Sequence, residues 1–274
     1  MIRLGLIGDN IKPSQAPRLH REAGRLAGIE VSYELLIPPE LGKDFDTVFE
    51  EGRAAGMRGF NITYPYKMAA VAKAEIEDPL VRRLGAINTV VFEGGRASGH
   101  NTDHSGFIAA YRAKFGNVDP GHTVIIGAGG AGSAVAFGLA ALGAPKLTIV
   151  DRDIARAETL AHALDGFATV AVASDVEDAA IGDAQGIVNC TPVGMVGHPG
   201  SPIDRSFLGP QRWAFEAIYT PDQTEFSLAA EAAGLAVLGG YELFIHQGLD
   251  AFRLFTGRSV DEAALRAALL RNST

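Results

Sequence analysis

Short apolar runs alternate with longer amphipathic segments along the first third of the chain. The runs have the length and the Leu, Ile, Val and Phe content of buried strands. They lie at residues 4–7, 31–36, 59–62 and 86–92. Helices are expected between them at 17–27, at 45–55 and from 67–74. This alternation predicts an α/β block with a mostly parallel sheet covered by helices.

The same alternation resumes after residue 105 and predicts a second α/β block. Strands are expected at 123–126, 146–150, 169–172, 186–189, 213–218 and 236–238. Helices are expected at 106–115, 131–142, 154–164, 243–255 and 261–271. We therefore place domain boundaries near 102–106 and 239–242. Periodicity alone leaves open whether the last two helices return to the first block.

Composition narrows the class of protein. The 274 residues carry a net charge of −8, which argues against a nucleic-acid-binding protein, whose binding face would be basic. Cys190 is the single cysteine, so an intramolecular disulfide and a zinc site built on several thiolates are excluded. No apolar run approaches about 18 residues, so no membrane span is expected. A soluble protein of the reducing cytoplasm is the expectation.

A glycine-rich turn joins the expected strand 123–126 to the expected helix 131–142. Its six residues are Gly127, Ala128, Gly129, Gly130, Ala131 and Gly132. The first glycine of this pattern permits a tight turn, the second lets the backbone approach a pyrophosphate, and the third lets helix and strand pack closely. The helix N-terminus then offers N–H groups to the phosphates. The turn predicts a dinucleotide cofactor, because its context on both sides is the required one.

Asp151 follows the next expected strand and stands 19 positions after Gly132. A carboxylate at this place accepts hydrogen bonds from the adenosine ribose and repels a 2′-phosphate, which favours NAD over NADP. Arg152 complicates this preference, because a guanidinium there could stack on adenine or pair with a phosphate. A surface role for Arg152 is the alternative. We therefore expect NAD, with use of NADP left open.

Lys67 and Asp103 are the candidates for proton transfer. Lys67 follows the strand 59–62, and ligands of open α/β sheets bind beyond the carboxyl ends of strands. A lysine that gives and takes a proton, oriented by a carboxylate, suits the interconversion of an alcohol and a ketone. Taken singly, Lys67 reads as a solvated helix residue and Asp103 as a helix N-cap. The dinucleotide turn in the same chain favours the catalytic interpretation.

Several ordered motifs resemble the shikimate/quinate dehydrogenase family over nearly the whole chain, from Gly8 to Gly257. The motifs are Asn61-Ile-Thr-Tyr-Pro-Tyr-Lys67, Gly85-Ala-Ile-Asn-Thr89, Gly99-His-Asn-Thr-Asp103, Gly127–Gly132, Asn189-Cys-Thr-Pro-Val-Gly-Met195 and His246-Gln247. The resemblance is closest to the branch with Asp151 after the second cofactor strand. That branch includes quinate/shikimate dehydrogenases that use NAD.

The resemblance implies a fold of two α/β domains and a role for each site residue. Residues 1–104, completed by 242–274, would form a substrate-binding and catalytic domain, and 105–241 a Rossmann-type NAD(P)-binding domain. Lys67 would be the acid/base residue with Asp103 beside it. Asn88 and Gln247 would bind ring hydroxyls of the substrate. Ser14, Thr63 and Tyr219 would bind its carboxylate. Thr191 and Gly240 would line the nicotinamide side. A homodimer is also expected.

The implied reaction is the reversible oxidation of shikimate to 3-dehydroshikimate with NAD, a step of the chorismate pathway of aromatic amino acid biosynthesis. Ala16 departs from the family pattern, which has a second serine in the carboxylate motif. Quinate, in a catabolic role, and an aminoshikimate therefore stay open as substrates. A ring-acid sensor without catalysis is the alternative from another class, and a folate-linked dehydrogenase is disfavoured by Ser14 and Tyr219. No nucleic acid, membrane or metal partner is expected.

Overall fold

The computed structural model describes residues 1–177, 179 and 181–271, and the chain divides into two compact units. Unit 1 contains Met1–Thr102 and Ile245–Thr274, of which residues 272–274 lie outside the described part. Unit 2 contains Asp103–Phe244. The sequence placed these borders after residues 104 and 241. The last helices thus belong by their contacts to the unit that begins the chain.

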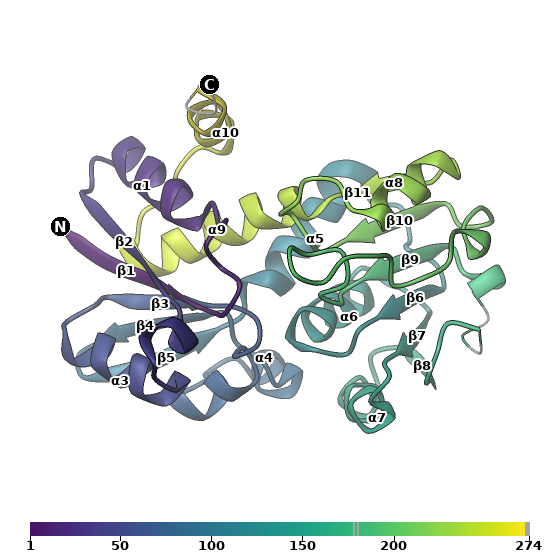
Figure 1. The fold of residues 1–274 in the computed structure, drawn as a ribbon, viewed down its shortest axis with the longest axis horizontal. Helices are drawn as coiled ribbons and strands as arrows, with labels where there is room; N and C mark the ends of the chain where they lie inside the picture. Colours follow the sequence, from purple (N-terminus) through teal and green to yellow (C-terminus); the bar gives the residue numbers. More distant parts are fainter. Residues whose placement is uncertain (178, 180, 272–274) are drawn as a thin grey trace. The chain divides into compact units, whose positions relative to one another are not determined.

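Unit 1 is built on a five-stranded sheet in the order β2-β1-β3-β4-β5 (Figure 1). Its strands are β1 (Ile2–Ile7), β2 (Val31–Leu36), β3 (Gly59–Ile62), β4 (Thr89–Glu93) and β5 (Arg96–His100). β1 pairs in parallel with β2 and β3, whereas β4 is antiparallel to both β3 and β5. The expectation of a mostly parallel sheet is therefore wrong for the β3-β4-β5 half.

A hairpin accounts for the β4-β5 part of that error. Gly94 and Gly95 have positive φ angles of 57° and 80°, which glycine adopts without strain, and they turn the chain straight back into β5. β5 was not predicted, because its sequence Arg-Ala-Ser-Gly-His lacks an apolar run. It has one neighbouring strand, β4, and Glu75 pairs with its other side.

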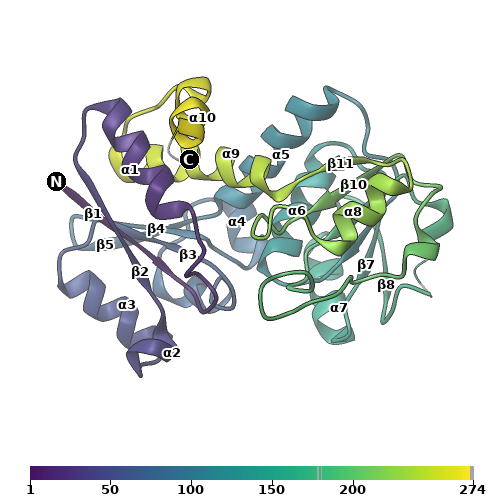
Figure 2. The same ribbon diagram turned by 45° about the horizontal axis from the view of Figure 1, so that its top comes forward.

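Helices lie on both faces of the unit 1 sheet (Figures 1 and 2). They are α1 (Ala16–Ala27), α2 (Pro38–Leu41), α3 (Phe45–Ala54), α4 (Pro79–Leu84), the second part of α9 (Gly240–Thr256) and α10 (Glu262–Arg271). The helix expected from 67–74 is only a 3-10 turn, Ala69–Lys73. It stops because the chain then pairs with β5: the Glu75 N–H donates to Ala97 O and the Gly99 N–H to Glu75 O, both at 2.8 Å.

Close packing explains why α9 joins unit 1. A Cβ atom at Gly248 of α9 would lie 2.6 Å from Leu19 Cδ1 of α1, so the two helices touch where a side chain is absent. The Arg58 Nε–H beside β3 donates to the carbonyl oxygen of Phe255 at 3.0 Å. Phe252 and Phe255 are fully buried. The C-terminal helices therefore complete the hydrophobic core of unit 1.

Unit 2 has a six-stranded, wholly parallel sheet in the order β11-β10-β9-β6-β7-β8. Its strands are β6 (Thr123–Ile126), β7 (Lys146–Val150), β8 (Thr169–Ala173), β9 (Gly186–Asn189), β10 (Trp213–Glu216) and β11 (Ala236–Leu238). Its helices are α5 (Thr102–Phe115), α6 (Gly130–Ala141), α7 (Ile154–Ala163), α8 (Glu225–Ala232) and the start of α9. Because strand order reverses at β6, the sheet has the doubly wound topology of dinucleotide-binding domains.

Every strand in this unit lies where the apolar runs predict it, but α8 was not predicted. That helix begins with a reciprocal capping box, in which Thr224 and Ser227 each bond the backbone N–H of the other. Among the described residues, no helix is long and apolar enough to cross a membrane.

His20 is an unusual member of the unit 1 core. It is 1% exposed, its ring stacks on Tyr33 at 4.8 Å, and its Nδ1 finds no hydrogen-bond partner within the described part of the chain. Burial among aromatic rings lowers its pKa from 6.5 to about 3. His20 is therefore neutral in the folded protein, whereas the unfolded chain takes up a proton below about pH 6.5.

Replacing His20 by Phe should make the protein less sensitive to acid. Between about pH 6.5 and 3 the unfolded wild type binds one proton more, so His20 alone lowers the free energy of unfolding by about 1.4 kcal/mol per pH unit as pH falls. Urea unfolding at pH 7 and pH 5 measures this difference, which H20F should lack. His162→Gln, at an exposed histidine, is the control and should keep the wild-type slope. Equal slopes for wild type and H20F would refute the assignment.

Candidate active site

One edge of the unit 1 sheet collects the polar residues predicted for substrate. In the register, Ile7 of β1 lies beside Ile62 of β3, Asn61 lies beside Thr89, and Thr89 beside His100. β1 and β3 end at this edge, the antiparallel β4 begins there, and β5 ends there. Residues 8–16, 63–67, 88 and 101–102 therefore lie at the same end of the sheet.

Asn88 and Gln247 are joined at this edge through Thr102. The Asn88 Nδ2–H donates to Thr102 Oγ1 at 3.0 Å, and Asn88 Oδ1 accepts from the Thr102 N–H at 2.8 Å. The Thr102 hydroxyl lies 3.3 Å from Gln247 Oε1, to which it can donate. The structure thus brings together the two residues expected to bind ring hydroxyls. Thr102 stands inside a recognised motif, but sequence reasoning gave it no role.

Ser14 and Thr63 come from two loops of the same edge. Ser14 Oγ accepts from the Ala16 N–H at 3.2 Å, at the start of α1. A Cβ atom at Gly8 would lie 2.4 Å from Thr63 Cγ2, so glycine lets the loop after β1 approach Thr63. Ala16 is buried and offers only a methyl group where the family has a hydroxyl.

Lys67 is half-buried and its backbone is tied to this edge. Its carbonyl oxygen accepts from the Ile87 N–H at 2.9 Å, directly before Asn88. Asp103 is 6% exposed and belongs by its contacts to unit 2. It lies in the first turn of α5, which starts at Thr102, four residues before the expected helix at 106. The expected place of Asp103 beside Lys67 stays a prediction.

The carboxyl edge of the unit 2 sheet holds the residues predicted for the cofactor. The register aligns the strand ends Ile126, Val150, Asn189 and Glu216. The segments that follow these strands therefore lie at the same edge of the sheet. They contain the glycine turn, Asp151, Thr191 and residues 217–219. β11 is the neighbour of β10 and ends at Leu238, which lies beside Phe215, one residue before the end of β10. The chain then continues to Gly240.

The glycine turn has the geometry that a dinucleotide needs. Gly127 has φ of 102°, and Gly132 is so close to it that an added Cβ would lie 1.8 Å from Gly127 O. Gly129 is different, because an added Cβ there would meet nothing within 4 Å. α6 begins at Gly130 with no side-chain cap on its first N–H groups. These N–H groups and the open space at Gly129 fit a diphosphate.

Asp151 connects the turn to the end of β7. Its Oδ2 accepts from the Ala128 N–H at 2.8 Å and its Oδ1 from the Asp153 N–H at 3.0 Å. A carboxylate has about four acceptor positions, so two remain for ribose hydroxyls. Arg152 is exposed beside it. The donors and acceptors present therefore fit an adenosine ribose without a 2′-phosphate.

Contacts within unit 2 fix Thr191 and Gly240, expected at the nicotinamide side, and Tyr219, expected to bind the substrate carboxylate. The Thr191 hydroxyl donates to Asn189 Oδ1 at 2.7 Å. Tyr219 stacks on Phe244, with ring centroids 4.6 Å apart. Gly240 packs so tightly that an added Cβ would lie 2.6 Å from the carbonyl oxygens of residues 217 and 218.

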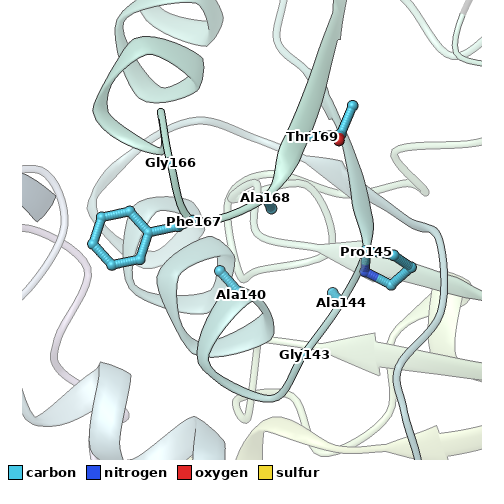
Figure 3. A pocket seen from close by; sticks show the side chains of 8 residues that line it. All are labelled: Ala140, Gly143, Ala144, Pro145, Gly166, Phe167, Ala168 and Thr169. Carbon is cyan, nitrogen blue, oxygen red and sulfur yellow. The ribbon is translucent and has the colours of Figure 1, made fainter.

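A surface hollow of unit 2 contains none of the predicted site residues (Figure 3). It lies between Ala140, Pro145, Phe167 and Thr169. Because β7 starts at Lys146 and β8 at Thr169, this hollow is at the amino edge, opposite the glycine turn. Within the described part of the chain, no group of three His, Cys, Asp or Glu side chains could hold a metal ion.

Three family models match the chain in succession. They are the shikimate dehydrogenase substrate binding domain over residues 6–90, shikimate / quinate 5-dehydrogenase over 110–192, and the shikimate 5'-dehydrogenase C-terminal domain over 240–270. The second model covers the glycine turn and Asp151. The models thus follow the division into two units along the sequence.

Named relatives are similar to the chain over almost its full length. A shikimate dehydrogenase (NADP(+)) of Streptomyces avermitilis is 44% identical over 96% of this chain and 93% of its own. A quinate/shikimate dehydrogenase (NAD(+)) of Corynebacterium efficiens is 39% identical over 98% of each chain. The structure of quinate dehydrogenase from Corynebacterium glutamicum in complex with NAD superimposes with a TM-score of 0.86, at 37% identity, over 98% of this chain and 99% of that one.

Replacing Gly129 by Ala should weaken cofactor binding without harming the fold. Its φ of −76° suits alanine and the position is open, so the methyl group would occupy only the space assigned to the diphosphate. We expect NADH affinity, measured by fluorescence titration, to fall about tenfold or more while the unfolding temperature is unchanged or slightly higher. Gly182→Ala, also in open space, is the matched control. Wild-type NADH affinity in G129A would disprove this location of the diphosphate.

Proposed function

The chain belongs to the shikimate/quinate dehydrogenase family, and we propose that it is an NAD-preferring shikimate dehydrogenase. It transfers a hydride reversibly between the ring hydroxyl of shikimate and the cofactor. The observation that carries this proposal is the polar edge of unit 1, where Thr102 joins Asn88 to Gln247 beside the backbone of Lys67. The dinucleotide turn of unit 2 supplies the other half of the reaction.

Oxidation of a secondary alcohol removes a hydride from carbon and a proton from oxygen. When bound, the nicotinamide supplies the hydride acceptor. Lys67, as the neutral amine, takes the hydroxyl proton while the carbonyl forms, and as the resulting ammonium it returns that proton in the reverse reaction. Asp103 orients the Lys67 ammonium and balances its charge.

The other unit 1 residues hold the substrate. Ser14 and Thr63, with Tyr219 of unit 2, donate hydroxyl hydrogen bonds to the substrate carboxylate. Asn88 and Gln247 bind ring hydroxyls as a pair, because Thr102 fixes both side chains. A site that uses paired hydrogen-bonding groups discriminates strongly against analogues that lack the matching hydroxyl.

Asp151 carries the preference for NAD. Its free acceptor positions suit the two ribose hydroxyls, and its charge repels a 2′-phosphate. The glycine turn binds the diphosphate, and Arg152 contacts the adenosine end. Thr191 and Gly240 line the nicotinamide side. NADP is a weaker cofactor in this arrangement.

Quinate is the second candidate substrate, and Ala16 is the observation that favours it. A buried methyl group in place of the family's second serine removes one donor to the carboxylate end and leaves room for a different substituent at ring carbon 1. The similarity to quinate/shikimate dehydrogenases that use NAD agrees with this alternative. A homodimer and a cytoplasmic location rest on the family resemblance and stay predictions.

The proposal predicts the outcome of crossing NAD and NADP with shikimate and quinate. We expect the highest kcat/KM for NAD with shikimate, measured as NADH formation at 340 nm, because Asp151 selects the cofactor and Asn88 with Gln247 the ring. Equal or better turnover of quinate would establish the second candidate. Binding of either acid without turnover in any pair would reject both and favour the sensor.

Replacing Lys67 by Ala should remove the acid/base group while leaving the cofactor site intact. We expect kcat to fall by about 10²–10⁴, the usual contribution of a positioned proton donor, with NADH affinity unchanged. Lys43→Ala is the control, because Lys43 makes an exposed ion pair with Glu51 at 2.6 Å in the same unit. Near-normal turnover in K67A would sink the assigned mechanism.

A further inference from the structure

Glu216, at the end of β10, is a buried carboxylate that lies in none of the sequence motifs. It is 1% exposed. Its Oε1 accepts from the Ile218 N–H and from Asn189 Nδ2, both at 3.0 Å. Its Oε2 accepts from the Thr224 hydroxyl at 2.6 Å and again from Asn189 Nδ2 at 3.1 Å. Each of these donors is uncharged, and each comes from a different segment of unit 2.

The bond to Asn189 sets the orientation of that amide. Because Nδ2 faces the carboxylate, Oδ1 faces the other way and accepts from the Thr191 N–H at 3.0 Å and the Thr191 hydroxyl at 2.7 Å. Nδ2 also donates to Val193 O at 3.2 Å. The turn 191–193 is therefore folded around one amide, and Glu216 determines which way that amide points.

The bonds to Ile218 and Thr224 hold the opposite side. Thr224 Oγ1 accepts the capping bond from the Ser227 N–H, so its proton is directed to Glu216. A Cβ atom at Gly194 would lie 3.2 Å from both Thr224 and Ile218, so the loop after Thr191 packs directly on this pair. Gly240 rests in turn on the carbonyl oxygens of residues 217 and 218.

We propose that Glu216 is a positioning residue for the nicotinamide end of the cofactor. Its carboxylate holds Thr191 in place through Asn189. It holds Gly240 in place through the segment 217–218. The adenosine end depends on a different contact, between Asp151 and the Ala128 N–H, although Gly127 of the glycine turn packs on the backbone of residues 190 and 191. The inference rests on the proposed function for the roles of Thr191 and Gly240. Glu216 itself contacts neither cofactor nor substrate.

A purely structural role is the competing explanation, and the energetics argue against it. Burial raises the pKa of Glu216 to about 7, more than its hydrogen bonds lower it. A buried carboxylate is a poor source of stability, since packed apolar side chains of similar volume do as well or better. What the carboxylate supplies is four directed acceptor positions at one point, which suits the positioning of several segments.

Glu216→Gln tests the proposal, because the amide keeps the volume but offers one acceptor oxygen and places an NH₂ group against donors. The readouts are the affinities for NADH and for ADP-ribose, which lacks the nicotinamide ring, and kcat on whichever substrate the wild type turns over. We expect NADH affinity and kcat to fall about tenfold or more, while ADP-ribose affinity stays within about twofold. The binding readouts need no substrate, so they remain decisive if the proposed reaction is wrong.

Two further variants keep the test decisive. Thr148→Val removes the bond between Thr148 and His122, 2.9 Å long and buried in the same sheet, and should leave both affinities at their wild-type values. Thr224→Val removes one donor to Glu216 and should repeat the E216Q pattern more weakly, which decides the matter if E216Q does not fold. Wild-type NADH affinity and kcat in E216Q, or an equal loss of ADP-ribose and NADH affinity, would overturn the proposal.

Discussion

The alignment of strand ends is the constraint on which the chemistry of both units depends. In unit 2 every strand is parallel, so the ends of β6, β7, β9 and β10 meet at one edge. In unit 1 the hairpin β4-β5 is antiparallel, yet the register brings its open end to the edge where β1 and β3 stop. Within each unit, short loops beyond these ends can therefore bring polar groups together without disturbing the core.

Buried asparagines hold those loops in both units. Asn88 bonds Thr102 in unit 1, and Asn189 bonds Thr191 in unit 2. An amide has donors at one end and an acceptor at the other, so it can link two segments of defined polarity. Such links carry little net stability, but a broken one leaves a buried polar group without its partner. A misfolded loop therefore loses more free energy than the correctly folded loop gains from the same hydrogen bonds. This difference favours a single arrangement of the loop.

The sequence predicted β2, β3, β6, β7, β9 and β11 to the residue, because each is an apolar run with clear borders. It missed β5 and α8, whose sequences lack that contrast. The glycine turn and Asp151 could be predicted as cofactor-binding residues because their spacing is local and characteristic. Thr102 and Glu216 acquire their roles only through partners distant in the chain, such as Gln247 and Asn189, and no local pattern encodes such partners.

Asp151 shows how cofactor preference and folding are linked in one side chain. The carboxylate to which we assign repulsion of a 2′-phosphate also accepts the Ala128 N–H inside the glycine turn. A residue without an acceptor at this place would leave this N–H unpaired and loosen the glycine turn. A replacement that admits NADP must therefore supply a neutral acceptor of similar reach as well as room for the phosphate. The choice of cofactor is in this sense constrained by the geometry of the turn, and changes of preference at this position require changes in its neighbours.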